Sequence, residues 1–356
     1  MAGLPGGLVR EPDQGEPWPT GARVANGREQ GLDGVGTRKQ KEMDMPDKET
    51  HTEVDMPDEA GRAYDVVIVG GGPAGLTAAL SLAHCRRSVL VVDAGEQRNL
   101  ASHGVHNYLG LEGVAPHELL RRGRAEAREA GAALRDGHVA AIQRCATGFA
   151  VALEDGATVT ASRVILATGL VDVLPDVEHL PEFYGTSVFH CPFCDGATVD
   201  DRRVVVLSWG DRAEGFTHEL CAWTRRLTLV THGHPIDEGV RARLERGGVT
   251  VRTDRALRLE GRDGQVAGVA LDDGETVPCD AVFFSIAHRT RAELARALGC
   301  ALTAEGYVRV DPRQQTTEPG VYAAGDITPT DEAALIAAAQ GLTAAVAVHE
   351  SLDSDP

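Results

Sequence analysis

The chain has 356 residues, 42% of them hydrophobic, and a formal net charge of −18. This length exceeds what one hydrophobic core usually supports, so we expect two domains and a tail. The acidic charge excludes nucleic acid and anionic membrane as partners, because both would repel it. The chain start lacks a signal-peptide pattern, and no run of about eighteen uninterrupted apolar residues indicates a membrane span, so we expect a cytoplasmic protein.

Residues 1–62 are rich in Gly, Pro, Asp, Glu and Lys and show almost no apolar periodicity. Such a composition cannot offset the entropy that ordering costs, so we predict a disordered tail. A near-repeat, Met43–Asp47 and Val54–Asp58, precedes the first predicted strand. It leaves open a second interpretation, in which translation begins at an internal methionine.

The first folded unit combines a strand, a glycine-rich loop, a helix and a second strand. A buried strand over Tyr64–Val69 leads into Gly70–Gly75, a helix follows over Leu76–Cys85, and the next strand ends in Asp93. Glycines and an acidic residue at these offsets are typical of dinucleotide binding, whereas a glycine loop alone is a weak signal.

Each residue of this motif has a physical task. Gly70 permits the tight turn, Gly72 lets the backbone approach a pyrophosphate, and Gly75 allows close packing of the helix whose N-terminus attracts that anion. Asp93 would accept hydrogen bonds from ribose hydroxyls.

Further elements follow in chain order. We predict a charged surface helix over Arg121–Ala133, a hairpin over Val151–Thr160 and a buried strand over Val164–Gly169. A turn at Gly320–Asp326 precedes a small-residue helix over Glu332–Leu352. We expect that last helix to pack against the first domain, which makes this domain discontinuous in sequence.

A Cys-x-x-Cys pair, Cys191 and Cys194, stands between the two nucleotide-binding stretches. Thiols at this spacing can close into a disulfide. A dithiol exchanges two electrons and a flavin accepts two, so the pair beside a flavin would form a redox unit. The alternative is structural zinc, which needs four ligands. The other cysteines are isolated and offer no second pair: Cys85, Cys145, Cys221, Cys279 and Cys300.

The order GGGPAGL, ATG, CxxCDG and GVYAAGD resembles the low-molecular-weight thioredoxin reductase family over nearly everything after Ala63. The resemblance implies an α/β fold with two Rossmann-like nucleotide-binding domains, in a homodimer. Residues 63–175 and 287–352 would form a discontinuous FAD-binding domain. Residues 176–286 would form a degenerate NAD(P)-binding-like domain that carries the cysteine pair.

The resemblance also implies roles for single residues. Cys194 would face the flavin, Cys191 would exchange with substrate, and Asp195 matches the family's acid/base residue. His190 and His106 are further candidates for moving protons, because histidine titrates near neutral pH, although each is equally typical of a structural residue. The residues that would hold FAD are Gly70, Gly72, Pro73, Ala74, Gly75, Asp93, Thr168, Gly169 and Asp326.

The second glycine loop departs from the family. The segment Ser208–Ala213 keeps only Gly210 and its last alanine from the Gly-x-Gly-x-x-Ala pattern. Trp209 adds bulk near the phosphate path, and Asp211 places a carboxylate where a pyrophosphate would sit, at a cost on the order of several kcal/mol. NADPH is therefore a doubtful cofactor. The alternative is that Arg212 rescues its binding.

A flavoenzyme without a pyridine nucleotide must pass electrons elsewhere, and dioxygen is the obvious acceptor. The Arg98–Asn99 and His106–Gly110 segments and the Cys-Pro-Phe-Cys core are similar to the dithiol oxidases of the gliotoxin and holomycin type. We therefore predict that FAD-dependent oxidation of a small-molecule dithiol yields a disulfide and hydrogen peroxide, with Phe193 lining the substrate pocket. Two alternatives stay open: an NADPH- or ferredoxin-driven thioredoxin-type reductase, and a flavin-binding redox sensor.

Overall fold

The computed structural model describes residues 61–285 and 287–354. The predicted tail, residues 1–62, and the internal methionines lie outside these residues, except for the last two positions of the tail. All statements below concern the described part of the chain.

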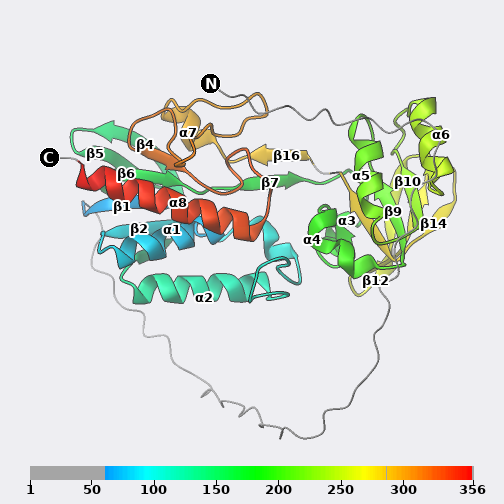
Figure 1. The fold of residues 1–356 in the computed structure, drawn as a ribbon, viewed down its shortest axis with the longest axis horizontal. Helices are drawn as coiled ribbons and strands as arrows, with labels where there is room; N and C mark the ends of the chain where they lie inside the picture. Colours follow the sequence, from blue (N-terminus) through cyan, green and yellow to red (C-terminus); the bar gives the residue numbers. More distant parts are fainter. Residues whose placement is uncertain (1–60, 286, 355–356) are drawn as a thin grey trace, which may run out of the picture. The chain divides into compact units, whose positions relative to one another are not determined.

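The first sheet has seven strands and forms around β1 (Figure 1). Its order is β3-β2-β1-β6-β5-β4, and β17 pairs with β6. Pairing is parallel around β1, where Val67 lies opposite Leu90 on one side and Val164 on the other, and antiparallel from β6 through β4. The strands are β1 Ala63–Val69, β2 Val89–Asp93, β3 Ala133–Asp136, β4 Val139–Cys145, β5 Gly148–Leu153, β6 Thr158–Leu166 and β17 Val321–Ala323.

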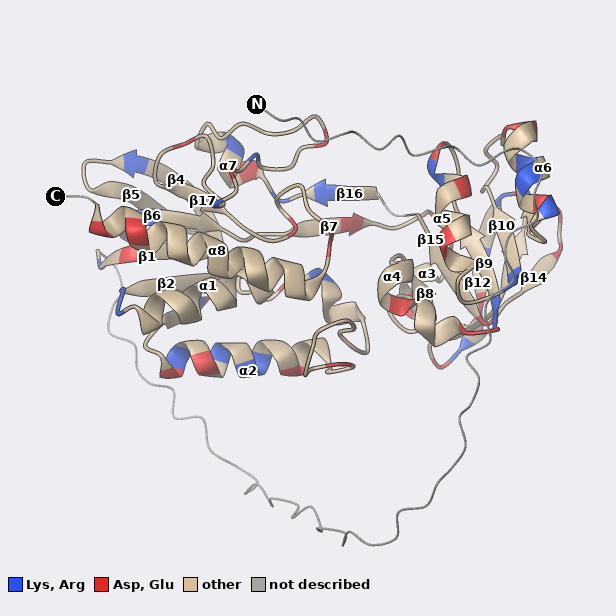
Figure 2. Ribbon diagram, in the orientation of Figure 1, with Lys and Arg blue, Asp and Glu red and all other residues tan. Residues whose placement is uncertain are grey.

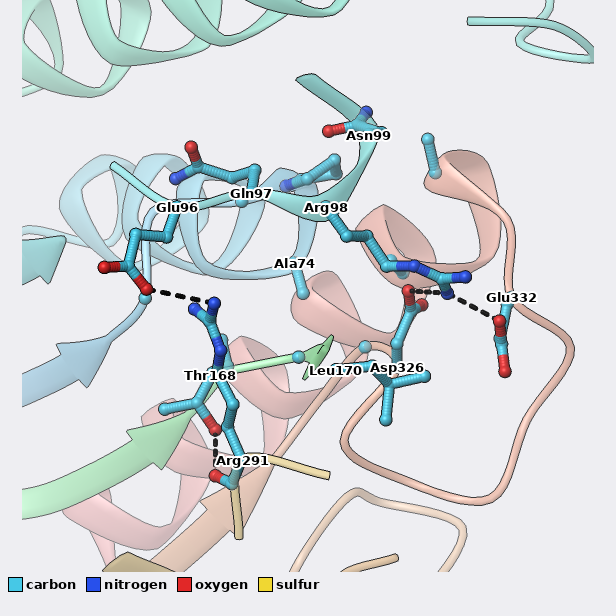
Figure 3. A pocket seen from close by; sticks show the side chains of 18 of the residues that line it. Ala74, Glu96, Gln97, Arg98, Asn99, Thr168, Leu170, Arg291, Asp326 and Glu332 are labelled. Carbon is cyan, nitrogen blue, oxygen red and sulfur yellow. Dashed lines mark hydrogen bonds and ion pairs between the residues drawn. The ribbon is translucent and has the colours of Figure 1, made fainter. Parts of the chain in front are cut away.

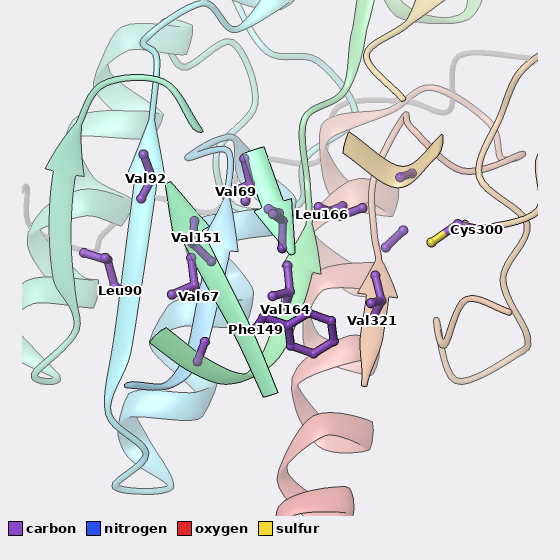
Figure 4. Packing of buried hydrophobic residues seen from close by; sticks show 14 of the residues in the cluster. Val67, Val69, Leu90, Val92, Phe149, Val151, Val164, Leu166, Cys300 and Val321 are labelled. Carbon is purple, nitrogen blue, oxygen red and sulfur yellow. The ribbon is translucent and has the colours of Figure 1, made fainter. Parts of the chain in front are cut away.

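Both faces of this sheet are covered. On one face, α1 (Pro73–His84) and α8 (Ala334–Asp353) pack against each other, while α2 (Pro116–Glu129) lies along α1. The α1–α8 contact is very close, because a Cβ on Gly341 would lie 2.1 Å from the carbonyl oxygen of Ala74. On the other face, aliphatic side chains of β1, β2, β5 and β6 form one buried cluster with Phe149 (Figure 4).

The second sheet is wholly parallel, with the order β11-β10-β9-β15-β8. A three-stranded antiparallel sheet, β12-β13-β14, follows β11 in the chain. The strands are β8 Val188–Phe189, β9 Arg203–Leu207, β10 Arg226–Val230, β11 Thr250–Arg252, β12 Ala256–Arg262, β13 Gln265–Leu271, β14 Thr276–Pro278 and β15 Ala281–Phe284. The helices of this region are α3 Leu180–Phe183, α4 Pro192–Asp195, α5 Arg212–Leu220 and α6 Glu238–Arg246.

Two short strands connect the regions that contain these sheets. β7 (Leu170–Val173) leaves the first sheet and β16 (Ala287–Thr290) returns to it, and the two pair antiparallel with each other. After β16 come α7 (Glu293–Ala297), β17 and α8, which rejoin the first region. The fold is therefore two Rossmann-like units, the first of them discontinuous in sequence. The exact domain boundaries stay a prediction.

Most predicted elements are confirmed, with shifted boundaries. The helix predicted over Leu76–Cys85 begins earlier, at Pro73, and ends at His84. The charged helix lies at Pro116–Glu129 rather than at Arg121–Ala133. Pro116 starts it, and Gly131, with φ at +105°, ends the helical run before β3. The strand predicted over Val164–Gly169 ends at Leu166, because Gly169 turns the chain with φ at +68°. Its last three residues thus leave the sheet.

Charge separates the helices of the first region. Figure 2 shows acidic and basic residues alternating along α2, whereas α8 is almost free of them. Among the described residues, α8 is the one helix whose length and composition would suffice to cross a membrane, a property that core helices share. One face of α8 is buried, and α8 packs against α1. The buried residues of α8 are mostly small: Ala337, Ala338, Gly341, Ala344, Ala345, Ala347 and Val348.

Candidate functional site

A pocket of about 470 Å³ collects almost all the predicted site residues. The side chains near its Asp326 end are shown in Figure 3. Gly75 does not line the pocket and lies beneath the glycine loop. The predicted residues that line it are Gly70, Gly72, Pro73, Ala74, Asp93, His106, Thr168, Gly169, His190, Cys191, Cys194, Asp195 and Asp326.

The glycine loop has no room for side chains. Gly70 has φ at +106°, and a Cβ there would lie 2.3 Å from the Ala167 carbonyl oxygen. A Cβ on Gly75 would lie 1.9 Å from the carbonyl oxygen of Gly70. Gly72 caps α1, and neither a side-chain cap nor an acidic residue in the first turn competes for the helix N-terminus. This end of α1 is therefore suited to a pyrophosphate.

Asp93 is buried at the end of β2 and already has partners. It accepts hydrogen bonds from the Gly71 amide at 3.0 Å and from the Gln97 amide nitrogen at 2.8 Å, and it pairs with Arg124 at 2.9 Å. A Cβ on Gly71 would lie 2.5 Å from the Asp93 carboxylate, so this position also requires glycine. The sequence analysis missed Gln97, which lines the pocket beside Asp93 and offers an amide to a ribose.

The other end of the pocket is formed by chain segments that follow β6 and β17. The Thr168 hydroxyl donates to the Arg291 carbonyl oxygen at 2.7 Å, and the Arg291 guanidinium pairs with Glu96 at 3.0 Å (Figure 3). Burial raises the pKa of Asp326, and Arg98, 3.3 Å away, opposes that rise. A glycine cradle at one end and a buried carboxylate at the other fit a dinucleotide.

Cys191 and Cys194 form a disulfide, with their Cα atoms 5.2 Å apart. The short helix α4 holds this geometry, since the Cys194 amide donates to the Cys191 sulfur at 3.1 Å. Phe193 between them is 73% exposed. Within residues 61–285 and 287–354, no group of three or more His, Cys, Asp or Glu side chains is arranged to hold a metal ion, so zinc has no ligand set at this pair.

Asp195 directly follows the disulfide and lines the same pocket. Burial raises its pKa to about 6, and the nearby charge of His106 opposes the shift. A carboxyl group with a pKa in this range can both take up and release a proton near neutral pH. Asp195 therefore stays a candidate for the general acid/base.

His106 is oriented by a residue that the sequence analysis missed. Its Nδ1 atom lies 2.7 Å from one carboxylate oxygen of Glu112, and the other oxygen accepts the Asn107 amide at 2.8 Å. The Asn107 side chain in turn donates to the Phe193 carbonyl oxygen at 3.1 Å. The loop that carries His106 is thus hydrogen-bonded to the segment His190–Gly196, which holds the disulfide and which we call the dithiol loop.

The surroundings of His190 argue against its predicted role as a proton carrier. Its Nε2 lies 2.9 Å from the Arg98 guanidinium, and its Nδ1 lies 2.8 Å from the Tyr184 hydroxyl. Arginine can only donate, so Nε2 must accept. Burial and then the Arg98 charge lower the pKa of His190 to about 4. The ring is neutral at pH 7, and both nitrogens are occupied.

The second glycine loop brings two side chains into contact with neighbouring segments. The Trp209 ring stacks on His234, with centroids 4.9 Å apart, and on His232, with centroids 5.6 Å apart. Ser208 is buried and donates to the Ser285 hydroxyl at 2.9 Å. These residues follow the carboxyl ends of β9, β10 and β15, where parallel sheets of this type bind dinucleotides.

Comparisons with known proteins agree with this geometry. The model of the pyridine nucleotide-disulphide oxidoreductase family matches residues 64–341. "Thioredoxin reductase tcpT" of Claviceps purpurea is 33% identical over 74% of this chain and 86% of its own length. The thioredoxin reductase of Mycolicibacterium smegmatis is 34% identical over 80% and 94%. The crystal structure of HlmI has a TM-score of 0.79 and is 34% identical, over 82% of this chain and 93% of that one.

Proposed function

This chain belongs to the pyridine nucleotide-disulphide oxidoreductase family and is a thioredoxin reductase-like disulfide oxidoreductase, and from that premise we propose that it oxidises a small-molecule dithiol to a disulfide with dioxygen as electron acceptor. The observation that carries this proposal is the contrast between the pocket that joins the first glycine loop to the disulfide and the second glycine loop, in which Trp209 stacks on His232 and His234.

FAD is the cofactor of the proposal. The close backbone approaches at Gly70 and Gly75 and the uncapped N-terminus of α1 would hold its pyrophosphate. Asp93 and Gln97 would hold one ribose, and Asp326 would hold the ribityl hydroxyls. When bound, FAD supplies the two-electron chemistry that returns the cysteine pair to its disulfide and reduces dioxygen to hydrogen peroxide.

The exchange steps fall to the cysteines. A substrate thiolate attacks the Cys191 sulfur, the bond to Cys194 breaks, and Cys194 leaves as a thiolate. The second substrate thiol, once deprotonated, attacks the substrate sulfur of this mixed disulfide, so a bond forms between the two substrate sulfurs, the bond to Cys191 breaks, and Cys191 leaves as a thiolate. Two electrons have then passed from the substrate to the cysteine pair.

The protons of the substrate thiols need an acceptor near these sulfurs. Asp195 lines the pocket with both cysteines, and its pKa of about 6 suits this task at neutral pH. We assign His106 to the same proton-transfer route. Glu112 fixes one nitrogen of the His106 ring, and the charge of His106 acts on Asp195. Phe193, largely exposed in the dithiol loop, would present an apolar surface to the substrate.

The test is turnover of a small dithiol in air. We expect a yellow protein that consumes one dioxygen for each disulfide formed and releases peroxide, measured with an oxygen electrode and a peroxide assay. Replacing Cys191 by Ser should abolish both readings, whereas a redox sensor would show no sustained turnover. A colourless preparation would refute the proposal.

The relatives that are named thioredoxin reductases favour a second candidate, an NADPH-dependent thioredoxin-type reductase. The two functions separate under anaerobic conditions. Mixing with NADPH should leave the oxidised flavin absorbance unchanged in the proposed oxidase, because Trp209 and Asp211 obstruct the nucleotide site. Rapid bleaching would establish the reductase instead.

A further inference from the structure

A cluster of polar side chains lies buried beside the dithiol loop. We call it the Arg98 cluster; its members are Arg98, Asp172, Tyr184, His190, His288 and Glu332. They come from separate segments: the 3₁₀ turn Arg98–Ala101, β7, the two sides of β8, β16, and the loop before α8. The cluster therefore ties together segments that are remote in sequence.

Arg98 is the centre of the cluster. Its guanidinium lies 2.9 Å from an Asp172 carboxylate oxygen, as an ion pair outside hydrogen-bond geometry, and donates to Glu332 at 2.5 Å. Glu332 also lies 3.0 Å from the Nδ1 atom of His288. The side chain of Arg98 is 13% exposed and that of Asp172 is 9% exposed. Charges this buried cost free energy unless they are paired.

The hydrogen bonds of the cluster can run in one direction only. Arg98 donates to His190 Nε2, so the proton of this ring is on Nδ1 and is donated to the Tyr184 oxygen. The Tyr184 hydroxyl then donates to Asp172 at 2.6 Å. Burial, followed by this bond to Asp172, raises the pKa of Tyr184, so the hydroxyl keeps its proton. A network with one proton arrangement holds its members in one geometry.

The pairing is strong enough to keep the charges in place. Burial disfavours the ionised form of Glu332, but His288 and Arg98 together lower its pKa to about 2. Burial likewise opposes the charge of Arg98, and the carboxylates of Asp172 and Glu332 outweigh it and raise its pKa. Glu332 and Arg98 therefore stay ionised across the physiological range.

His190 connects the Arg98 cluster to the disulfide. His190 immediately precedes Cys191, and Glu332 belongs to the segment that lines the pocket next to Asp326. We propose that the Arg98 cluster is a positioning device, which acts through His190 to set the disulfide against the Asp326 end of the nucleotide pocket. This inference rests on the proposed function, since the position matters only if the cysteines exchange electrons there.

Other contacts of the same segment support this role. A Cβ on Gly185 would lie 2.0 Å from the Ala101 carbonyl oxygen, and His103 Nε2 lies 2.8 Å from the Thr186 hydroxyl. With the bond from Asn107 to Phe193, the chain from Arg98 to Asn107 touches the segment around the dithiol at four places. Such repeated contacts favour one relative position of these two segments.

The test removes one hydroxyl from the cluster. Tyr184→Phe keeps the ring and breaks the link between His190 and Asp172, while Tyr322→Phe removes a hydroxyl from a buried tyrosine outside the cluster. Amide exchange of the peptide over residues 186–196 should rise about tenfold in Tyr184→Phe, the effect of losing a buried hydrogen bond to a charged group. It should stay unchanged in Tyr322→Phe.

A second readout reports the position itself. In a Cys191→Ser background, the thiolate of Cys194 should give charge-transfer absorbance with the flavin, and Tyr184→Phe should weaken it at equal FAD content. Arg98→Lys, which keeps the charge but not the planar fork, should act in the same direction. Unchanged exchange and absorbance in both variants would overturn the inference. A protein without flavin would refute the proposed function, yet the exchange measurement would still decide on the cluster.

Discussion

Two loops of this molecule occupy equivalent places in the two Rossmann-like units and differ in their side chains. The loop Gly70–Gly75 follows β1 and leads into α1, and the loop Ser208–Ala213 follows β9 and leads into α5. The first has backbone approaches that no side chain could enter. At the second, Trp209 stacks on two histidines. The comparison shows that two loops at equivalent places in the fold differ in the side chains that they bring to a possible phosphate site.

The largest effect should come from replacing a member of the cysteine pair, which lines the same pocket as the first loop. Replacing Cys194 by Ser removes the leaving sulfur, so dithiol turnover should fall on the order of 1,000-fold or more. Steady-state oxygen consumption measures the change. Cys145→Ser, at an exposed isolated thiol, is the matched control and should retain full activity. Equal activity of both variants would remove the disulfide from the reaction.

Asp195→Asn should have the next largest effect. It keeps the shape but cannot accept a proton, so kcat should fall about 100-fold. Because burial raises the pKa of this group to about 6, the parent rate should rise with pH through that value as the carboxylate forms. The pH profile of kcat/KM tests this. A profile that keeps the same rise in Asp195→Asn would assign it to another group.

A pair of glycine substitutions compares the two helices that follow these loops. Gly75→Ala forces a Cβ against the Gly70 carbonyl oxygen and should cost about 2 kcal/mol or more of unfolding free energy, with loss of bound FAD. Gly215→Ala, in α5 with open space around it, should instead stabilise by about 0.5–1 kcal/mol. Denaturant unfolding and the absorbance ratio of flavin to protein decide the comparison. Equal effects would refute it.

The smallest effect should come from reopening the second loop. Trp209→Gly combined with Asp211→Ser removes the stacked ring and the carboxylate. Anaerobic flavin reduction by NADPH should then rise about tenfold above the parent, equivalent to ~1.4 kcal/mol. Trp209→Phe keeps an aromatic ring in place and should show no gain. If the parent already reduces its flavin at a reductase rate, the second loop is functional as it stands.

Much of the fold and part of the site follow from local sequence signals. The run Tyr64–Val69 has the apolar continuity of a buried parallel strand, and Gly70 and Gly75 stand where the backbone approaches itself. The pair Cys191 and Cys194 is defined by spacing alone. These features are predictable because each depends on residues within one short segment.

The Arg98 cluster and the partners of His106 could not be predicted in this way. Asp172, His288 and Glu332 meet only because β7 and β16 pair with each other and the chain returns before α8. Glu112 carries no spacing signal that would relate it to His106. His190 is predicted as a neighbour of the cysteines, but its pKa is lowered by burial and then by the charge of Arg98, 92 positions away in the chain. Side-chain contacts between remote segments leave no periodic trace.

The close crossing of α1 and α8 couples the two parts of the discontinuous first region. Gly341 packs on the carbonyl oxygen of Ala74, in the first turn of α1, so a helix that follows β17 supports the turn where the proposed pyrophosphate site begins. The proposed FAD site therefore cannot form from the segment that precedes β7 alone, and it depends on the chain that returns through β16 and β17.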